Sequence, residues 1–249
     1  GETACPAYYS VSLPGIGVEM TGRSHSAIWR MTGAGWIVIQ VNSDEGQARV
    51  EVDSEAGEVR GSNPVHRIYQ GKGQPAGFSG HFVVRFNAPI VEWTVSGDCA
   101  WVRLDAPDTL LVRAATSFTS TGAARNNLEA EIPDWDFDRV KASLESVWEE
   151  SLSRISVRSG DEGLLRQFYG SLWRASLLPR TVSDCGEPVR YDDFSLWDTY
   201  RALHPLLTII EPSRVSDMVC SLLDRYDQGG WLPIFPCWGS YTSAMIGDH

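Results

Sequence analysis

The first half of the chain carries short apolar stretches separated by turn residues. Several alternate apolar and polar side chains, as in Val50-Glu51-Val52 and Trp101-Val102-Arg103-Leu104. This period of two is typical of a strand with one buried and one solvated face. Many short strands at this spacing predict an antiparallel β-sandwich, without a helix before about residue 124. We expect strands at Tyr8–Leu13, Trp36–Val41, Ala48–Val52, His81–Phe86, Val91–Val95, Ala100–Leu104 and Leu110–Ala115.

The pattern changes to a helical one after Thr121. A first helix is indicated by apolar residues at 3.6-residue spacing from Phe137 to Ile155, with Asp134 or Asp136 as its cap. Pro179 ends a second helix, and the third and fourth, joined by few residues, should form an antiparallel hairpin. These three helices are expected near Glu162–Leu177, Phe194–Ile210 and Pro212–Tyr226, and Gly229–His249 reads as a loop.

Strands that precede helices predict two domains rather than an interleaved α/β fold. We expect a multidomain, β-then-α chain: a β-sandwich over residues 1–124, incomplete at its N-terminus, and a linker helical segment over 125–158. Residues 159–249 would be the first helices of a helical domain. Their wide apolar faces indicate that this domain continues beyond His249.

Composition narrows the possible partners. The formal net charge is −11 and the basic residues are scattered, which argues against nucleic acid. No apolar run reaches about 18 residues, so we expect no membrane span, and the first 20 residues do not form a signal peptide. The five cysteines include no C-x-x-C pair, which disfavours a structural zinc site and leaves open one or two disulfides.

Candidate chemistry gathers between Tyr191 and Thr199, where three carboxylates lie beside large aromatic residues. Asp198 is adjacent to Trp197 and falls in the first turns of the expected helix, where the helix dipole favours an ionised acid. An acid beside a tryptophan can hold a sugar, by hydrogen bonds to hydroxyls and stacking on the ring. The alternative is that Asp192 or Asp193 caps the helix while Trp197 is core.

The other candidates are weaker. The aromatic segment from Gly229 to Gly239 is either a pocket wall or a packed connection. His25, His66 and His81 have no acid or nucleophile at a telling spacing, and His204 reads as a core histidine. The chain has no serine elbow, phosphate loop or dinucleotide fingerprint.

Several ordered motifs resemble glycoside hydrolase family 92. The strongest is the segment from Asp193 to Leu207, which reads DFSLWDTYRALHPLL. The sandwich half, from Tyr8 onward, resembles the family more loosely. Further matches lie at Ala124–Phe137, Phe168–Arg180, Ser216–Val219, Gly229–Pro233 and Met245–Gly247.

The resemblance implies a β-sandwich joined through linker helices to an (α/α)6 barrel. It also implies a secreted, periplasmic or cell-surface exo-α-mannosidase that inverts the anomeric centre, needs calcium and acts on mannose-containing glycans such as N-glycans and mannan. The catalytic glutamate and aspartate of the family, and most of its calcium ligands, are expected after His249, so we assign no catalytic residue. The resemblance gives Asp198, Trp197, Trp238 and His249 as substrate-binding residues.

The chain departs from the family pattern in three places: Thr21–His25, a short loop from Asp184 to Tyr191, and Gly239–Thr242, where many members have an Asn-Glu pair. These departures leave the linkage open, including mannose-phosphate linkages. The remaining alternatives are another (α/α)6 glycosidase, such as a glucoamylase-like or phosphorylase-like enzyme, and a non-catalytic carbohydrate-binding fragment.

Overall fold

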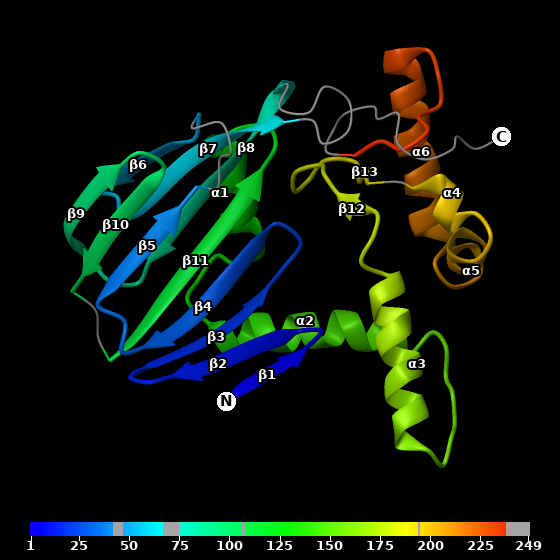
Figure 1. Ribbon diagram of the computed structural model, residues 1–249, viewed down its shortest axis with the longest axis horizontal. Helices are drawn as coiled ribbons and strands as arrows, with labels where there is room; N and C mark the ends of the chain where they lie inside the picture. Colours follow the sequence, from blue (N-terminus) through cyan, green and yellow to red (C-terminus); the bar gives the residue numbers. More distant parts are fainter. Residues whose placement is uncertain (42–46, 67–74, 106–107, 194, 238–249) are drawn as a thin grey trace. The chain divides into compact units, whose positions relative to one another are not determined.

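The computed structural model describes residues 1–41, 47–66, 75–105, 108–193 and 195–237 (Figure 1). They form two compact units. The sandwich unit comprises residues 1–65, 77–148 and 184–186, and the helical unit comprises residues 66–76, 149–183 and 187–249, each with the gaps just given.

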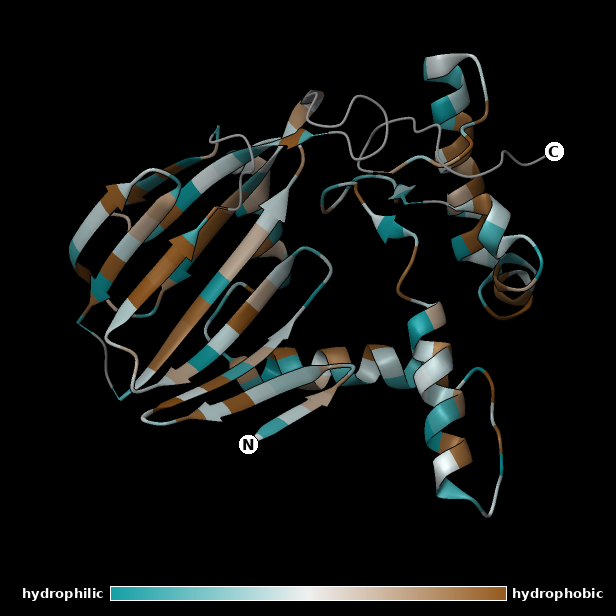
Figure 2. Cartoon of the chain, viewed as in Figure 1, coloured by the Kyte–Doolittle hydropathy of each residue, from teal (hydrophilic) through white to brown (hydrophobic). Residues whose placement is uncertain are grey.

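Two sheets form the sandwich unit, and their neighbouring strands pair antiparallel, as in β1–β2, β3–β4, β4–β11, β6–β7 and β9–β10, so the predicted antiparallel sandwich is confirmed. The larger sheet has the order β1-β2-β3-β4-β11-β8-β7-β6, and the smaller has the order β5-β10-β9. Hydrophobic and hydrophilic residues interleave along many strands (Figure 2). The strands are β1 (Glu2–Cys5), β2 (Tyr8–Leu13), β3 (Ile16–Gly22), β4 (Ser26–Thr32), β5 (Trp36–Gln40), β6 (Arg49–Asp53), β7 (Glu58–His66), β8 (Pro75–Phe86), β9 (Ile90–Ser96), β10 (Cys99–Leu104) and β11 (Thr109–Ser117).

Strands β1, β3, β4 and β7 were not predicted, and β4 shows why. Ile28 in this strand is buried under the helices, whereas Trp29 and Met31 pack toward the core between the sheets. A strand with apolar residues on both faces loses the alternation that reveals a half-buried strand. The inter-sheet core itself is built from buried residues that include Val59, Ala100, Val102, Leu104 and Leu110.

Two helices cover the outer face of the larger sheet: α1 (Thr121–Glu131) and the first part of α2 (Phe137–Leu152). Their buried contacts are Ile28, Val83, Ala115, Ala124, Leu128, Ile132, Phe137 and Val140. The Asp136 carboxylate accepts a hydrogen bond from the Arg139 backbone at 2.9 Å, in agreement with its expected capping role.

Helix α1 corrects the expectation that no helix begins before residue 124. Its sequence is mostly polar, and only Ala124, Asn127 and Leu128 are buried, so it shows little apolar periodicity. The helix begins at the cap Ser120, whose hydroxyl accepts a hydrogen bond from the Ala123 backbone at 3.0 Å.

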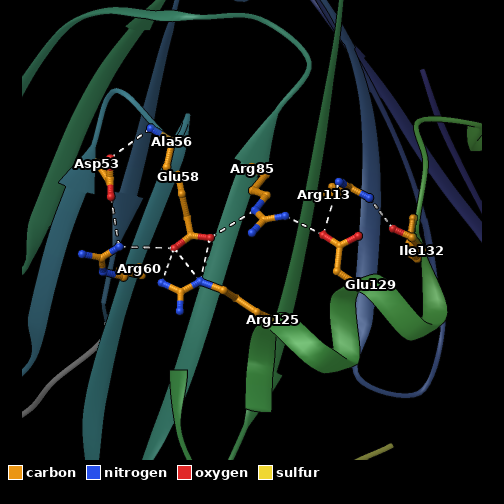
Figure 3. A network of polar contacts seen from close by, with 9 residues as sticks. All are labelled: Asp53, Ala56, Glu58, Arg60, Arg85, Arg113, Arg125, Glu129 and Ile132. Atoms are coloured by element: carbon orange, nitrogen blue, oxygen red, sulfur yellow. Dashed lines mark hydrogen bonds and ion pairs between the residues drawn. The ribbon is translucent and has the colours of Figure 1, made fainter. Parts of the chain in front are cut away.

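A polar network fastens α1 to the sheet (Figure 3). At its centre is Glu58 of β7, which is 1% exposed. Arg125 of α1 donates to Glu58 at 2.7–3.0 Å, and Arg85 of β8 donates to it at 3.1 Å. Arg85 also pairs with Glu129 of α1. A buried carboxylate is tolerated because arginines surround it.

The helical unit contains the last residues of α2, helices α3 (Glu162–Ala175), α4 (Leu196–Thr199), α5 (Leu203–Ile210) and α6 (Pro212–Gly229), and the short strands β12 (Arg180–Thr181) and β13 (Tyr191–Asp192). Leu207 and Met218 are buried together where α5 and α6 pack. Helix α6 has proline in its first turn and ends at Gly230, whose φ of 76° suits glycine, as the sequence predicted. None of the described helices combines the length and apolarity that a membrane crossing requires.

The single helix expected over Phe194–Ile210 is wrong. Over this range the structure instead has the one-turn helix α4 and the separate helix α5. Pro205 accounts for the break, because proline lacks the N–H that a helix interior needs and is tolerated only in a first turn. It is the third residue of α5, so the helix begins at Leu203 rather than continuing from α4.

Candidate functional site

Helix α4 presents an aromatic side chain and an acid to solvent. Trp197 is 37% exposed, and Asp198 is also exposed. The Trp197 ring lies 5.7 Å from the ring of Tyr200, centre to centre, at an angle of 34°. The Ser195 hydroxyl donates a hydrogen bond to the Asp198 carboxylate. The structure thus keeps this expected pair together and accessible.

The two other carboxylates of the segment do not cap a helix. Asp192 is 1% exposed and accepts a hydrogen bond from Arg225 of α6 at 2.9 Å. Asp193, with a φ of 66°, pairs with Arg180 of β12. Both are engaged with arginines, which leaves Asp198 as the exposed acid of the three.

Strands β12 and β13, the second of which shortly precedes α4 in the sequence, form a two-stranded sheet. Thr181 pairs with Tyr191 and Arg180 with Asp192. The backbone N–H of Tyr191 donates to the Ser221 hydroxyl at 2.9 Å, so α6 contacts β13 through Ser221 as well as through Arg225. Just before the strand, Arg190 pairs with Asp224 of α6. A site on such a supported turn is pre-organised for binding.

Cys237 also contacts Asp193. Burial, followed by its hydrogen bond to Asp193, raises the pKa of the Cys237 thiol to about 12. The thiol therefore stays protonated at neutral pH and acts as a hydrogen-bond donor. In the same segment Trp231 is 79% exposed. Trp238 and His249 lie outside the described residues.

His204 is partly buried, but neither ring nitrogen makes a hydrogen bond of normal geometry with the described residues, so it is not a satisfied core histidine. Its two ring nitrogens are buried. Burial is the main influence on its pKa and lowers it, so the ring is held neutral at neutral pH.

Sequence reasoning missed three partners of this segment. Tyr200 lies three residues after Trp197, a helical spacing that brings side chains together and was available as a signal. Arg180 and Arg225 had no such signal, because they are 13 and 33 residues from their acidic partners.

The sandwich unit contains a separate hollow of about 560 Å³ between β6 and β9. Trp93 and Val95 line it together with Glu51 and Asp53. Arg60 pairs with both of these acids, at 3.3 Å in each case. The hollow thus has an aromatic side chain in its wall, but both of its acids are paired with Arg60. We assign it no role.

Two family models together cover the chain. The glycosyl hydrolase family 92 N-terminal domain matches residues 1–127, and the family 92 catalytic domain matches residues 123–249. The sandwich and the helices that follow it match the N-terminal and catalytic domains of a glycosidase family, which defines the class of protein. The chain belongs to glycosyl hydrolase family 92.

Solved structures agree with this assignment. An inverting mannosidase of family GH92 from Bacteroides thetaiotaomicron VPI-5482 matches 98% of the chain with a TM-score of 0.87 and 25% identity. A GH92 α-mannosidase from Bacteroides thetaiotaomicron in complex with mannoimidazole matches 98% with a TM-score of 0.83 and 25% identity. The predicted order, a sandwich followed by the start of the helical catalytic domain, is confirmed.

The chain spans only part of these proteins. It covers 37% of the inverting mannosidase and 38% of the mannoimidazole complex. An uncharacterized secreted glycosidase from Arthroderma benhamiae is 31% identical over 133 residues, which are 52% of this chain and 15% of that protein.

Calcium, which the family implies, does not fit the described side chains. Calcium takes six to eight oxygen ligands. Among the described residues, the one group of three or more potential metal-ligating side chains consists of a histidine, a glutamate and a cysteine. We therefore derive no step through calcium from this chain.

Proposed function

We propose that this chain is part of an exo-acting, inverting α-mannosidase that removes terminal mannose from N-glycans or mannan. The observation that carries the proposal is the exposed Trp197–Asp198 pair, which shortly follows the arginine-paired acids Asp192 and Asp193. Family membership and the mannosidases among the similar structures support it.

In this proposal Asp198 and Trp197 make different contacts with the sugar. The Asp198 carboxylate accepts hydrogen bonds from sugar hydroxyls, and the indole of Trp197 packs on the apolar C–H face of the ring. Tyr200 and Ser195 fix their directions, through the ring contact and the hydroxyl hydrogen bond. Trp238 and His249 are proposed as further contacts to the substrate.

The proposal for the whole protein also includes a catalytic acid, a catalytic base and calcium. An inverting glycosidase needs an acid for the leaving oxygen and a base for water, with carboxyls about 6.5–9.5 Å apart. We assign neither to a described residue. Calcium enters the proposal only through family membership, and we assign it no step. Because its proposed substrates are glycans, we place the whole protein outside the cell or in the periplasm. The relative from Arthroderma benhamiae is likewise named as a secreted glycosidase.

The direct test is to assay the whole protein on α-1,2-mannobiose, with calcium and with chelator, and to follow the released anomer by NMR. We expect β-mannose, and none with chelator. Asp198→Ala should lower kcat/KM by about 10- to 100-fold, because hydrogen bonds to a charged group contribute about 1.5–3 kcal/mol.

Asp227→Asn is the matched control, since it changes an exposed acid of α6 without touching α4. It should leave kcat/KM unchanged. Release of α-mannose would contradict inversion, and equal kcat/KM for Asp198→Ala and Asp227→Asn would remove Asp198 from the site. Failure to release mannose in either condition would sink the simple mannosidase and favour a mannose-phosphate substrate or a non-catalytic glycan-binding protein.

A further inference from the structure

Three side chains from distant parts of the sequence meet in the sandwich unit. Nδ1 of His25 lies 2.8 Å from Oε1 of Glu131. Sγ of Cys185 lies 3.5 Å from that nitrogen and 3.4 Å from that oxygen. Within the part of the chain that the structure describes, this is the one group of three potential metal-ligating side chains whose ligand atoms all lie within 4.8 Å of one another.

The distances between these atoms approach those of a tetrahedral metal site. Zinc bonds of about 2.3 Å to sulfur and about 2.0–2.1 Å to nitrogen or oxygen, at tetrahedral angles, place sulfur about 3.5 Å from the other two ligands. The two observed sulfur distances match. The same geometry requires about 3.3 Å between nitrogen and oxygen, so the His25–Glu131 hydrogen bond would open by about 0.5 Å.

Surrounding groups hold Glu131 in the required direction. Its Oε2 accepts hydrogen bonds from the His25 backbone N–H, at 3.0 Å, and from the Ser26 hydroxyl. That leaves Oε1 directed at the His25 ring and the Cys185 thiol. Metal-ligating carboxylates are commonly fixed in this way by outer hydrogen bonds.

Hydrogen bonds also fix the position of Cys185. Its backbone N–H donates to Oδ1 of the fully buried Asn127, at 2.9 Å. The amide nitrogen of Asn127 donates to Asp184 at 2.7 Å, and Asp184 also accepts from the Ser117 hydroxyl at 2.9 Å. The cysteine thus returns to the sandwich in a defined position, although 160 residues separate it from His25.

A catalytic cysteine is the other chemistry that a His–Glu–Cys cluster suggests. Burial, and after it the charge of Glu131, raises the pKa of the Cys185 thiol to about 11. A nucleophilic cysteine requires the opposite shift, toward the thiolate. The free thiol is therefore not activated as a nucleophile, whereas a metal ion that binds it would itself displace the thiol proton.

We propose that His25, Glu131 and Cys185 bind a zinc-class divalent transition metal, with water as the fourth ligand. Nitrogen and sulfur donors favour such an ion and disfavour calcium, so this site is separate from the calcium chemistry of the family. The side chains of His25 and Glu131 are 13% and 11% exposed, which leaves limited access for one water. Through Cys185, Glu131 and His25, the ion would cross-link the Asp184–Gly186 segment to α1 and to the start of β4.

The proposed site differs from the sequence-based expectation that a structural zinc site is unlikely. That expectation rested on the absence of C-x-x-C pairs. Here the three ligands come from three separate segments and include a single cysteine, so no local spacing could indicate them.

Cobalt(II) is the probe, because a cysteine thiolate bound to it gives a charge-transfer band in the near ultraviolet. The whole protein is stripped with chelator, titrated with cobalt(II) and compared with Cys185→Ser. We expect the band in the wild type and its loss in Cys185→Ser. Removal of this ligand should weaken binding by more than the roughly 10- to 100-fold that follows from changes in outer hydrogen-bond partners.

Cys99→Ser is the matched control, since it removes a partly buried thiol elsewhere in the sandwich unit. It should keep the band. Circular dichroism checks that each variant is folded, and His25→Gln replaces Cys185→Ser if the latter is not. A wild type without the band at saturating cobalt, or a band that survives both Cys185→Ser and His25→Gln, would overturn the proposal and leave a purely hydrogen-bonded cluster.

Discussion

Glu58 is a buried acid whose neighbours are arginines from three elements. Arg125 comes from α1, Arg85 from β8, and Arg60 lies 3.6 Å away in β7. Hydrogen bonds in such a group are strong when complete, and loss of one partner leaves buried charge without compensation. Glu58 therefore contributes to the attachment of α1 to the sheet, in addition to the apolar contacts of the helix.

Glu58→Gln should lower the free energy of unfolding by about 3–5 kcal/mol, the usual cost of removing one partner of a buried ion pair. Urea titration of the folded protein measures it. Glu51→Gln is the control, because Glu51 pairs with Arg60 on the surface and is 69% exposed, so its loss should cost at most about 1 kcal/mol. Equal losses for the two variants would contradict the role given to Glu58.

Two buried carboxyls also make stability depend on pH. Burial opposes ionisation at both, but arginine hydrogen bonds at Glu58 and the His25 and Ser26 hydrogen bonds at Glu131 outweigh it, so both pKa values are lowered. A carboxyl with a lowered folded pKa contributes stability that is present above its unfolded pKa, about 4.3, and is lost as pH falls through the folded value.

We therefore expect the free energy of unfolding to decrease as pH falls below about 4.3. Urea titrations at a series of pH values measure the slope. Glu58→Gln should flatten it, because it removes one of the carboxyls whose pKa is lowered in the folded protein. Stability that rises on acidification would show that these carboxyls are not ionised in the folded protein.

Helix α1 depends on packing more than on its own sequence. Leu128 and Ile132 are fully buried against the sheet, and Phe137 and Val140 extend the contact to α2. Since short polar helices are marginal alone, tertiary burial is what holds α1 in place. Because tertiary burial rather than a periodic apolar pattern stabilises α1, sequence patterns do not reveal this helix.

Leu128→Ala should cost about 2–5 kcal/mol, because it removes apolar contact and leaves a cavity beneath α1. Chemical denaturation measures the loss. Val147→Ala in α2 is the matched control, as Val147 is 53% exposed and its truncation should change stability by no more than about 0.5 kcal/mol. A small effect at Leu128 would mean that α1 can leave the sheet without unfolding it.

At the scale of the whole chain, the helical unit exposes several large apolar side chains. Ile209 and Trp231 are both 79% exposed, and Leu164 and Leu223 are more than half exposed. Apolar surface of this kind promotes association. We expect residues 1–249 alone to self-associate, which analytical ultracentrifugation would detect.

Ile209→Ser with Trp231→Ser should reduce that association, whereas Ser153→Ala, at an exposed serine, should not change it. A wild-type chain that stays monomeric at 27.5 kDa and melts cooperatively would contradict the expectation.

The sequence indicated the architecture better than the details that position side chains. Strand β2 was predicted with its observed limits, and α3 to within two residues, because both have clear periodic patterns. The Trp197–Asp198 pair was found because its residues are adjacent. Contacts that bridge distant segments, such as Asp192 with Arg225 or His25 with Cys185, have no local pattern, so only the folded chain brings them into view.

The return of Asp184–Gly186 to the sandwich unit also sets an order of events during synthesis. Cys185 is 54 residues after Glu131. At about 5–20 residues per second, a ribosome adds the cysteine roughly 3 to 11 s after the glutamate. Helices α2 and α3 are made in that interval. Most of the sandwich can therefore fold early. The Asp184–Gly186 segment can join it only after part of the catalytic domain has been translated.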